Sequence, residues 1–245
     1  MADQNDITKI AEAAAEGAKF GTQTLQTTEK ILKGIVKILD EPAKDAVGII
    51  GDSLKFFRWE RQLRFFERYD EILKAKGIIH TKSIPPKFAL PIITQASLEE
   101  DDELQDLWAR LTVNAMDPNF KLELRYAYLE VIKSLSPLDV KMLDFFFEAL
   151  KKDPSVKLEQ VTDYSLKKEQ IITGLGISEN DYNLSIYNLF RVQCLAPAVM
   201  ESTSIMFGGE PTTIFKGSKA VTMTPLGVNF VKACVEDSVK GEVGI

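Results

Sequence analysis

The sequence predicts a mainly α-helical protein: N-terminal long helices and a helical bundle, followed by a winged-helix-like α+β C-terminal module. Apolar residues recur at helical spacing along most of the first 152 positions, and prolines or glycines interrupt that spacing. Two β-prone stretches separated by a Gly-Gly pair stand near the end of the chain. We divide the chain into a coiled-coil-like N-terminal helix (1–40), a helical core (41–134) and the winged-helix-like module (135–245).

The composition excludes some functions. Hydrophobic residues make up 45% and charged residues 27% of the chain, which is typical of a globular protein. The net charge of −6 argues against a protein that coats nucleic acid through an overall basic field. The first 17 residues lack the basic and apolar regions of a secretory signal, so we expect none, and no apolar run reaches about 18 residues. We therefore expect a cytoplasmic location, and peripheral contact with the inner membrane stays open.

Residues for metal or nucleophilic catalysis are scarce. The one histidine, His80, stands in a loop before a Pro-Pro pair, so a Ser-His-Asp triad or a histidine-rich zinc site is not expected. Cys194 and Cys234 stand in apolar surroundings and are interpreted as reduced core residues. The sequence has no glycine-rich phosphate loop after a strand. We expect no catalytic residue, no cofactor and no bound metal.

Residues 7–39 predict one long helix with a narrow apolar seam. The seam has alternating four- and three-residue spacing, as in a coiled coil; its members are Ile7, Ala11, Ala14, Ala18, Gly21, Leu25, Thr28, Leu32, Ile35 and Leu39. Its small residues would let a second helix approach closely. Two interpretations stay open: the seam packs on the body of the protein, or it mediates self-association.

A second helix is predicted from Asp40 and Pro42 to about Gly77, and it carries a stripe of arginines. The stripe consists of Arg58, Arg61, Arg64 and Arg68, interleaved with aromatic residues. Such a stripe is typical of phosphate, base or anionic-lipid binding. The interpretation we favour is that it pairs with an acidic helix of the same chain.

The most acidic stretch of the sequence is SLEEDDELQDLWARL (97–111). Ser97 and Glu100 fit a capping box, which predicts a helix start there, with the acids in the first turns. A metal site would use the acids that share one helix face, which are Glu99, Asp102, Glu103 and Asp106. We favour ion pairing instead, with Glu100 and Asp101 meeting the arginine stripe across a helix pair.

The remaining chain predicts helices at about 120–134, at 135–152 after Ser136-Pro137, and on both sides of a turn at Gly174–Gly176. β-prone stretches at 196–203 and 212–223 and a last helix from Thr224-Pro225 complete a winged-helix pattern. The predicted reading helix (178–193) has one basic residue, Arg191, and the module has eleven lysines and arginines against fourteen acids. We therefore expect protein contacts rather than DNA binding.

Several stretches resemble the bacterial Abi-alpha family, named for abortive infection by phage. They are PPKFALPIITQASLEEDDELQDLWARLTVNAMDPN (85–119), VIKSLSPLDVKMLDFF (131–146), VTMTPLGVNFVKACV (221–235) and the basic helix 51–78. The resemblance covers about 47–236. One departure is that no histidine follows the Asp-Pro of AMDP. The resemblance implies a cytoplasmic, mostly helical bacterial protein with a role in phage defence, and it carries no catalytic residue.

Three hypotheses for function follow. The first is a non-enzymatic defence protein that acts through protein association, with self-association at the N-terminal seam and membrane contact through region 31–66. The second is a nucleic-acid-binding regulator that uses the Arg58–Arg68 stripe or the winged helix. The third is a metal-dependent nuclease built on the acids of 97–106.

Overall fold

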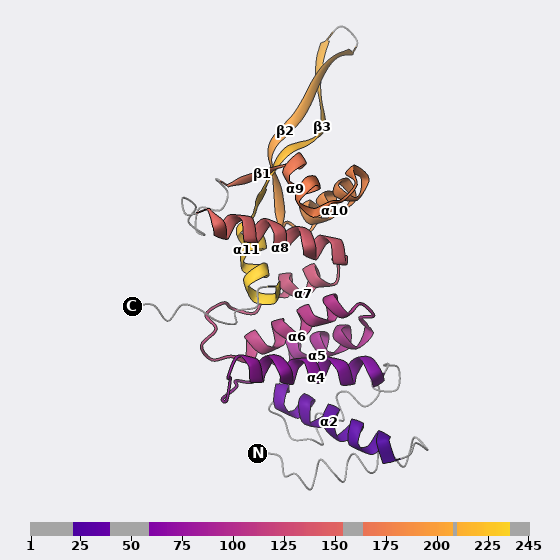
Figure 1. Cartoon of the computed structure of the whole chain (residues 1–245), viewed down its shortest axis with the longest axis vertical. Coiled ribbons are helices and arrows are strands. Elements are labelled where there is room, and N and C mark those ends of the chain that lie inside the picture. The colour runs from indigo at the N-terminus through magenta and orange to yellow at the C-terminus, as the bar shows by residue number, and fades with distance from the viewer. Residues whose placement is uncertain (1–21, 40–58, 154–163, 208–209, 236–245) are drawn as a thin grey trace. The chain divides into compact units, whose positions relative to one another are not determined.

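The computed structural model describes residues 22–39, 59–153, 164–207 and 210–235. These residues are mainly helical, with one three-stranded antiparallel sheet (Figure 1). They fall into two compact units. Residues up to Leu129 belong to the first unit, and residues from Glu130 to Glu236 form the second.

The first unit is built around helix α4. Its helices are α2 (Thr22–Leu39), α4 (Trp59–Ala75), α5 (Pro86–Leu98), α6 (Asp102–Met116) and the start of α7 (Tyr126–Ile132). Helix α4 packs against α2, α5 and α6, and Phe65, Tyr69 and Trp108 are fully buried there. Helix α7 is shorter than the predicted helix at about 120–134, and the next helix starts at Pro137.

The acidic helix begins four residues later than the predicted capping box places it. Helix α5 continues to Leu98, and Ser97 is buried in its last turn, where the hydroxyl donates to the Ile93 carbonyl at 2.6 Å. The N-cap of α6 is Asp101, whose carboxylate accepts from the Leu104 amide at 3.0 Å. The Ser97–Glu100 capping box is therefore wrong, because the apolar face of α5 carries Ser97 into the core and leaves capping to Asp101.

Helix α2 is the described part of the predicted N-terminal helix. Its residues Ile31, Leu32, Ile35 and Ile38 are buried, and α2 packs on α4 and α5. The Ile84 amide also donates to the Ile38 carbonyl at 2.9 Å. This part of the seam therefore packs on the body of the protein. Helix α2 also contains Leu25, and these predicted features lie outside the described residues: Ala11, Ala14, Ala18, Gly21, Arg58 and the helix start at Asp40-Pro42.

Gly34 allows the close approach of α2 to α4. A Cβ atom added at Gly34 would lie 2.2 Å from Cδ1 of Phe66, whose own side chain is buried. Any residue larger than glycine would have to displace the aromatic ring or the helix. The close contact explains why a helix interior holds glycine, which disfavours helix formation.

The second unit contains the sheet and the remaining helices. Its elements are α8 (Pro137–Lys152), β1 (Ser165–Lys167), α9 (Lys168–Leu175), α10 (Glu179–Arg191), β2 (Leu195–Phe207), β3 (Glu210–Met223), α11 (Pro225–Phe230) and a π-helical turn (Val231–Val235). The strands are ordered β1-β3-β2, all antiparallel. Strand β1 has three residues, too few to give the sequence a β pattern, and it was not predicted.

Polar caps fix the helix starts of this unit. The Ser136–Asp139 capping box begins α8, and the Asn188 amide from α10 donates to Asp139 Oδ2 at 2.8 Å and to the Ser134 carbonyl at 2.7 Å. Thr224 caps α11 through the Gly227 amide at 2.9 Å. The predicted helix starts at Ser136, Ser178 and Thr224 are confirmed.

We predict that Gly34→Ala destabilises the protein by about 1–3 kcal/mol, because the added methyl group overpacks against Phe66. In a Phe66→Ala background the same change should instead stabilise by up to about 1 kcal/mol, since alanine favours helix and the clash is gone. Denaturant unfolding of the four variants measures both effects. Equal destabilisation by Gly34→Ala in the two backgrounds would show that Phe66 does not cause it.

Candidate functional site

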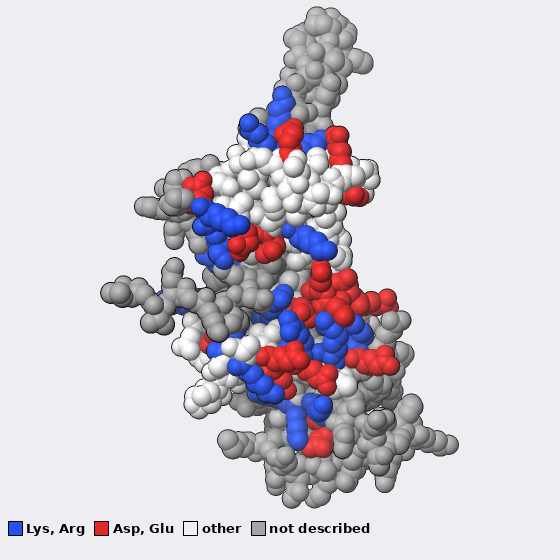
Figure 2. Space-filling model, viewed as in Figure 1, with Lys and Arg blue, Asp and Glu red and all other residues white. Residues whose placement is uncertain are grey.

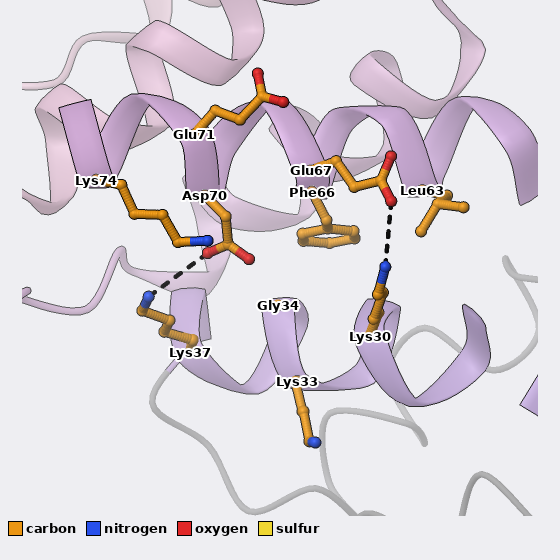
Figure 3. Close-up of a pocket in the computed structure, with 10 residues that line it drawn as sticks. All are labelled: Lys30, Lys33, Gly34, Lys37, Leu63, Phe66, Glu67, Asp70, Glu71 and Lys74. Atoms are coloured by element: carbon orange, nitrogen blue, oxygen red, sulfur yellow. Dashed lines mark hydrogen bonds and ion pairs between the residues drawn. The ribbon is translucent and has the colours of Figure 1, made fainter. Parts of the chain in front are cut away.

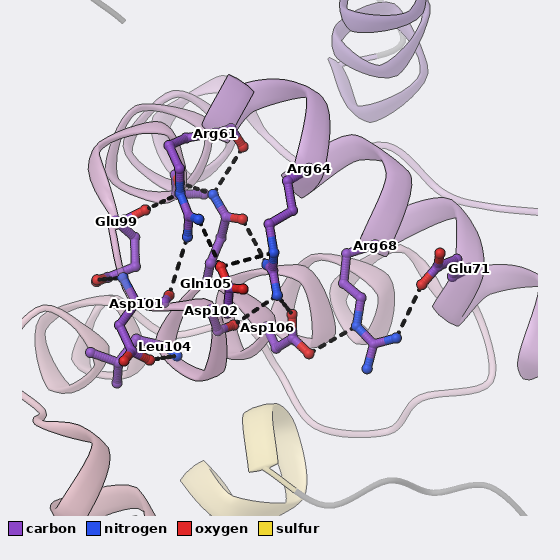
Figure 4. A network of polar contacts seen from close by, with 11 residues as sticks. Arg61, Arg64, Arg68, Glu71, Glu99, Asp101, Asp102, Leu104, Gln105 and Asp106 are labelled. Carbon is purple, nitrogen blue, oxygen red and sulfur yellow. Dashed lines mark hydrogen bonds and ion pairs between the residues drawn. The ribbon is translucent and has the colours of Figure 1, made fainter. Parts of the chain in front are cut away.

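The three described arginines of the predicted stripe, Arg61, Arg64 and Arg68, lie along one face of α4. That face is turned toward α6 and the linker between α5 and α6 (Figure 4). Their three- and four-residue spacing places them on adjacent turns of one helix. This surface, which we call the α4–α6 charged interface, also includes Asp102, Gln105 and Asp106.

Arg61 contacts the end of α5, the start of α6 and the linker between them. Its Nε donates to the Glu99 carbonyl at 2.6 Å, its Nη1 to Asp102 Oδ1 at 2.7 Å and its Nη2 to the Asp101 carbonyl at 3.3 Å. Its side chain is only 17% exposed. One guanidinium therefore satisfies the Glu99 carbonyl where α5 ends and pairs with the Asp102 carboxylate where α6 starts. It also donates to the Asp101 carbonyl, which accepts from the Gln105 amide as well.

Arg64 and Arg68 share Asp106. Arg64 lies 3.1 Å from Asp106 Oδ1 and 3.0 Å from Asp102 Oδ1, and Arg68 Nε donates to Asp106 Oδ2 at 2.8 Å. Asp106 is 15% exposed, so it is the most enclosed carboxylate of the interface. The two guanidiniums neutralise a charge that would be unfavourable without a partner.

Gln105 is a member of this interface that the sequence pattern did not single out. It is fully buried, and its Nε2 donates to the carbonyls of Ala96 and Arg61 at 2.7 and 2.9 Å, while its Oε1 accepts from Arg64 Nη1 at 2.8 Å. The available signal was its position beside Leu104 and Trp108 on the apolar face of α6. A glutamine there must find internal partners.

The interpretation that the arginine stripe pairs within the chain agrees with this geometry for the three described arginines. Asp102 and Asp106 supply carboxylates, whereas Asp101 uses its own to cap α6. Glu100 lies in the linker between α5 and α6. The hydrogen bond from Arg61, together with the charges of Arg64 and Arg61, lowers the pKa of Asp102, so this carboxylate stays ionised at neutral pH.

A second feature of the first unit is a groove of about 530 Å³ between α2 and α4 (Figure 3). Gly34, Leu63 and Phe66 give it an apolar part, and lysines and acids alternate along its rim. Lys30 lies 3.3 Å from Glu67 and Lys37 lies 3.8 Å from Asp70, and all four side chains are about half exposed. Such exposed pairs contribute little stability, so apolar packing holds α2 in place.

Other titratable groups have ordinary structural surroundings. Burial and the nearby charge of Asp139 raise the pKa of the Cys194 thiol to about 12, so this thiol is protonated at neutral pH. Cys234 is buried as well, and His80 is exposed. Within the described ranges, no three His, Cys, Asp or Glu side chains converge as a metal site. Also within these ranges, no helix has the length and apolar character needed to cross a membrane.

Charges of both signs are mixed on the face of the described residues that Figure 2 shows. Figure 2 shows lysine and arginine side chains beside aspartate and glutamate side chains on the viewed face of the described residues. On this face the blue side chains do not merge into one broad basic area, and such an area is the footprint expected of a nucleic-acid-binding surface.

These features describe a mainly helical protein in which arginines and acids of the first unit meet between two helices. The family model for "Abortive infection alpha" matches residues 60–234, and the chain belongs to that family. The matched segment contains the α4–α6 charged interface and the caps at Ser136 and Thr224. Searches of curated proteins and of solved structures found no match.

We predict a coupling free energy of about 1 kcal/mol between Arg64 and Asp106, because both are partly withdrawn from water. The cycle compares Arg64→Gln, Asp106→Asn and the double variant by urea unfolding. The exposed pair Lys133–Glu130, at 2.9 Å, joins the last turn of α7 to the residue that follows the helix. It is the control and should couple by only about 0.2–0.5 kcal/mol. Additive effects at Arg64 and Asp106 would contradict the interface.

Proposed function

We propose that this chain acts in abortive infection as a non-enzymatic protein that works through protein association. Membership in the Abortive infection alpha family associates it with phage defence. The observation that carries the rest of the proposal is the α4–α6 charged interface. Three of the arginines that were candidates for phosphate binding, Arg61, Arg64 and Arg68, contact Asp102 and Asp106, two of the acids that were candidates for metal catalysis. Arg61 and Asp106 are largely enclosed.

The second unit fits a winged-helix module used for protein contacts. The order α8-β1-α9-α10-β2-β3 and the strand order β1-β3-β2 support this assignment. In such a module α10 takes the place of the reading helix. Its charged residues are Glu179, Asp181 and Arg191, so it offers few anchors for phosphates.

A nucleic-acid-binding regulator is the alternative that the winged-helix order favours. Arg61, Arg64 and Arg68 would have to leave their carboxylate partners in order to bind phosphates, and this would expose the core at Gln105. Membrane contact through the apolar face of α2, the described start of region 31–66, would similarly require α2 to leave α4, because Ile31, Leu32 and Ile35 are buried. We therefore place association ahead of both, and flotation with anionic vesicles tests the membrane step.

Expression of the protein in bacteria, with and without phage, tests the proposed function. We expect growth arrest only upon infection, with reduced phage progeny. Ala18→Glu, which places a charge in the predicted seam, should abolish this response because self-association is lost. Ala13→Glu places the same charge outside the seam and should leave the response intact.

Protection by the Ala18→Glu variant equal to that of the unchanged protein would contradict association through the seam. A salt-dependent shift of duplex DNA by the purified protein, lost on Arg64→Gln, would favour the regulator instead. Equal abundance of the variants, measured by immunoblot, excludes loss of protein as the cause.

A further inference from the structure

Helix α10 presents an exposed stripe on its outer face. Asn180, Leu184, Tyr187 and Arg191 are all exposed, at helical spacings of four, three and four residues. Leu184 is 66% and Tyr187 58% exposed, which places them among the most exposed large apolar side chains of the described residues. The opposite face holds α10 in the second unit; its buried residues include Tyr182, Ile186 and Leu189.

The spacing of this stripe is the same in both directions along the helix axis. Asn180 lies four residues before Leu184, and Arg191 lies four residues after Tyr187. The apolar pair therefore lies at the centre, with one end polar and flanked by Glu179 and Asp181, and the other end basic. A twofold axis between residues 185 and 186 exchanges the two ends and superposes the apolar pair on itself.

We propose that this face binds a second copy of the chain through antiparallel packing of α10 on α10. Leu184 of each copy then contacts Tyr187 of the other. Arg191 donates to the neutral Asn188 side chain of its own helix and so keeps an unneutralised charge. It reaches Asn180 of the other copy and Asp181 beside it. The twofold axis makes two equivalent charge contacts of this kind. Both kinds of contact form at once only because the stripe is symmetric about its centre.

The charges favour a second copy over nucleic acid as the occupant. Glu179 forms an ion pair with Lys168 of its own chain, so the exposed Asp181 carries the argument. Its carboxylate would repel a phosphate backbone, whereas it complements Arg191 of another chain. The helix of 13 residues spans about 20 Å. A contact of that length is smaller than a standard protein interface, so we expect a weak dimer that depends on protein concentration.

This inference is independent of the predicted seam at 7–39, and the experiment separates the two. Sedimentation velocity over a concentration series is carried out with the full-length Ala18→Glu chain, so that the seam does not contribute. In that background, Leu184→Glu should weaken the dimer at least about tenfold, because it places two charges in the apolar centre. Ile79→Glu is the control, since Ile79 is 87% exposed but lies in the first unit. This substitution should leave the dissociation constant of the dimer unchanged.

A charge exchange tests the antiparallel geometry itself, in the same background. Arg191→Glu and Asn180→Lys should each abolish homodimers, because like charges then face each other across the twofold axis. A mixture of the two variants should form heterodimers. In such a heterodimer the carboxylate introduced in one chain meets the ammonium group introduced in the other, while the second contact keeps its original residues.

A monomeric Ala18→Glu chain at every concentration would overturn the proposal. An unchanged dimer after Leu184→Glu would also overturn it, and so would a mixture of Arg191→Glu and Asn180→Lys chains that does not associate. Loss of the phage response in Ala18→Glu, with the α10 dimer intact, would support the seam and the α10 contact as separate interfaces.

Discussion

The structure of the first unit depends on how three arginines of α4 are neutralised. Guanidinium groups cannot lose their charge, so Arg61, Arg64 and Arg68 need anionic or carbonyl partners wherever they lie against a core. The break between α5 and α6 supplies both kinds at one place. Carbonyls of Glu99, Asp101 and Asp102 point to the arginines, and the first turns of α6 add two carboxylates. The acidic start of α6 is thus part of the packing of α4.

The same constraint bears on function. Arg61, Arg64 and Arg68 with Asp102 and Asp106 hold α4 against α6, and the caps at Ser136 and Thr224 fix helix starts in the second unit. The matched family segment, residues 60–234, includes these residues. Among the described residues, the outer stripe of α10 is a less charged surface that stays exposed. It is suited to helix–helix contact, as is the predicted N-terminal seam, and this is why association is the proposed mode of action.

Much of the fold could be predicted from local sequence. Helix starts at Ser136, Ser178 and Thr224 were found because capping residues next to an apolar periodicity are a strong local signal. The helix start predicted at Ser97 was wrong because the Ser97 hydroxyl donates to a carbonyl inside helix α5. That arrangement depends on tertiary burial, which local sequence does not show. Strand β1 was not predicted because pairing with β3, rather than its own three residues, makes it a strand.

The candidate site was predicted in kind but not in detail. Spacing alone placed the arginines on one face and suggested acidic partners. It could not show that Asp102 and Asp106 supply carboxylates while Asp101 caps α6, because those roles depend on the helix beginning after Asp101. The role of Gln105 required knowing which face of α6 is covered.

The central claim is that the α4 arginines are held within the protein. It is tested most directly by NMR measurement of solvent exchange at arginine Nε protons. We predict that the Nε proton of Arg61 exchanges at least about tenfold more slowly than that of the exposed Arg125, which corresponds to about 1.4 kcal/mol of opening free energy. Equal exchange at the two arginines would contradict the α4–α6 charged interface.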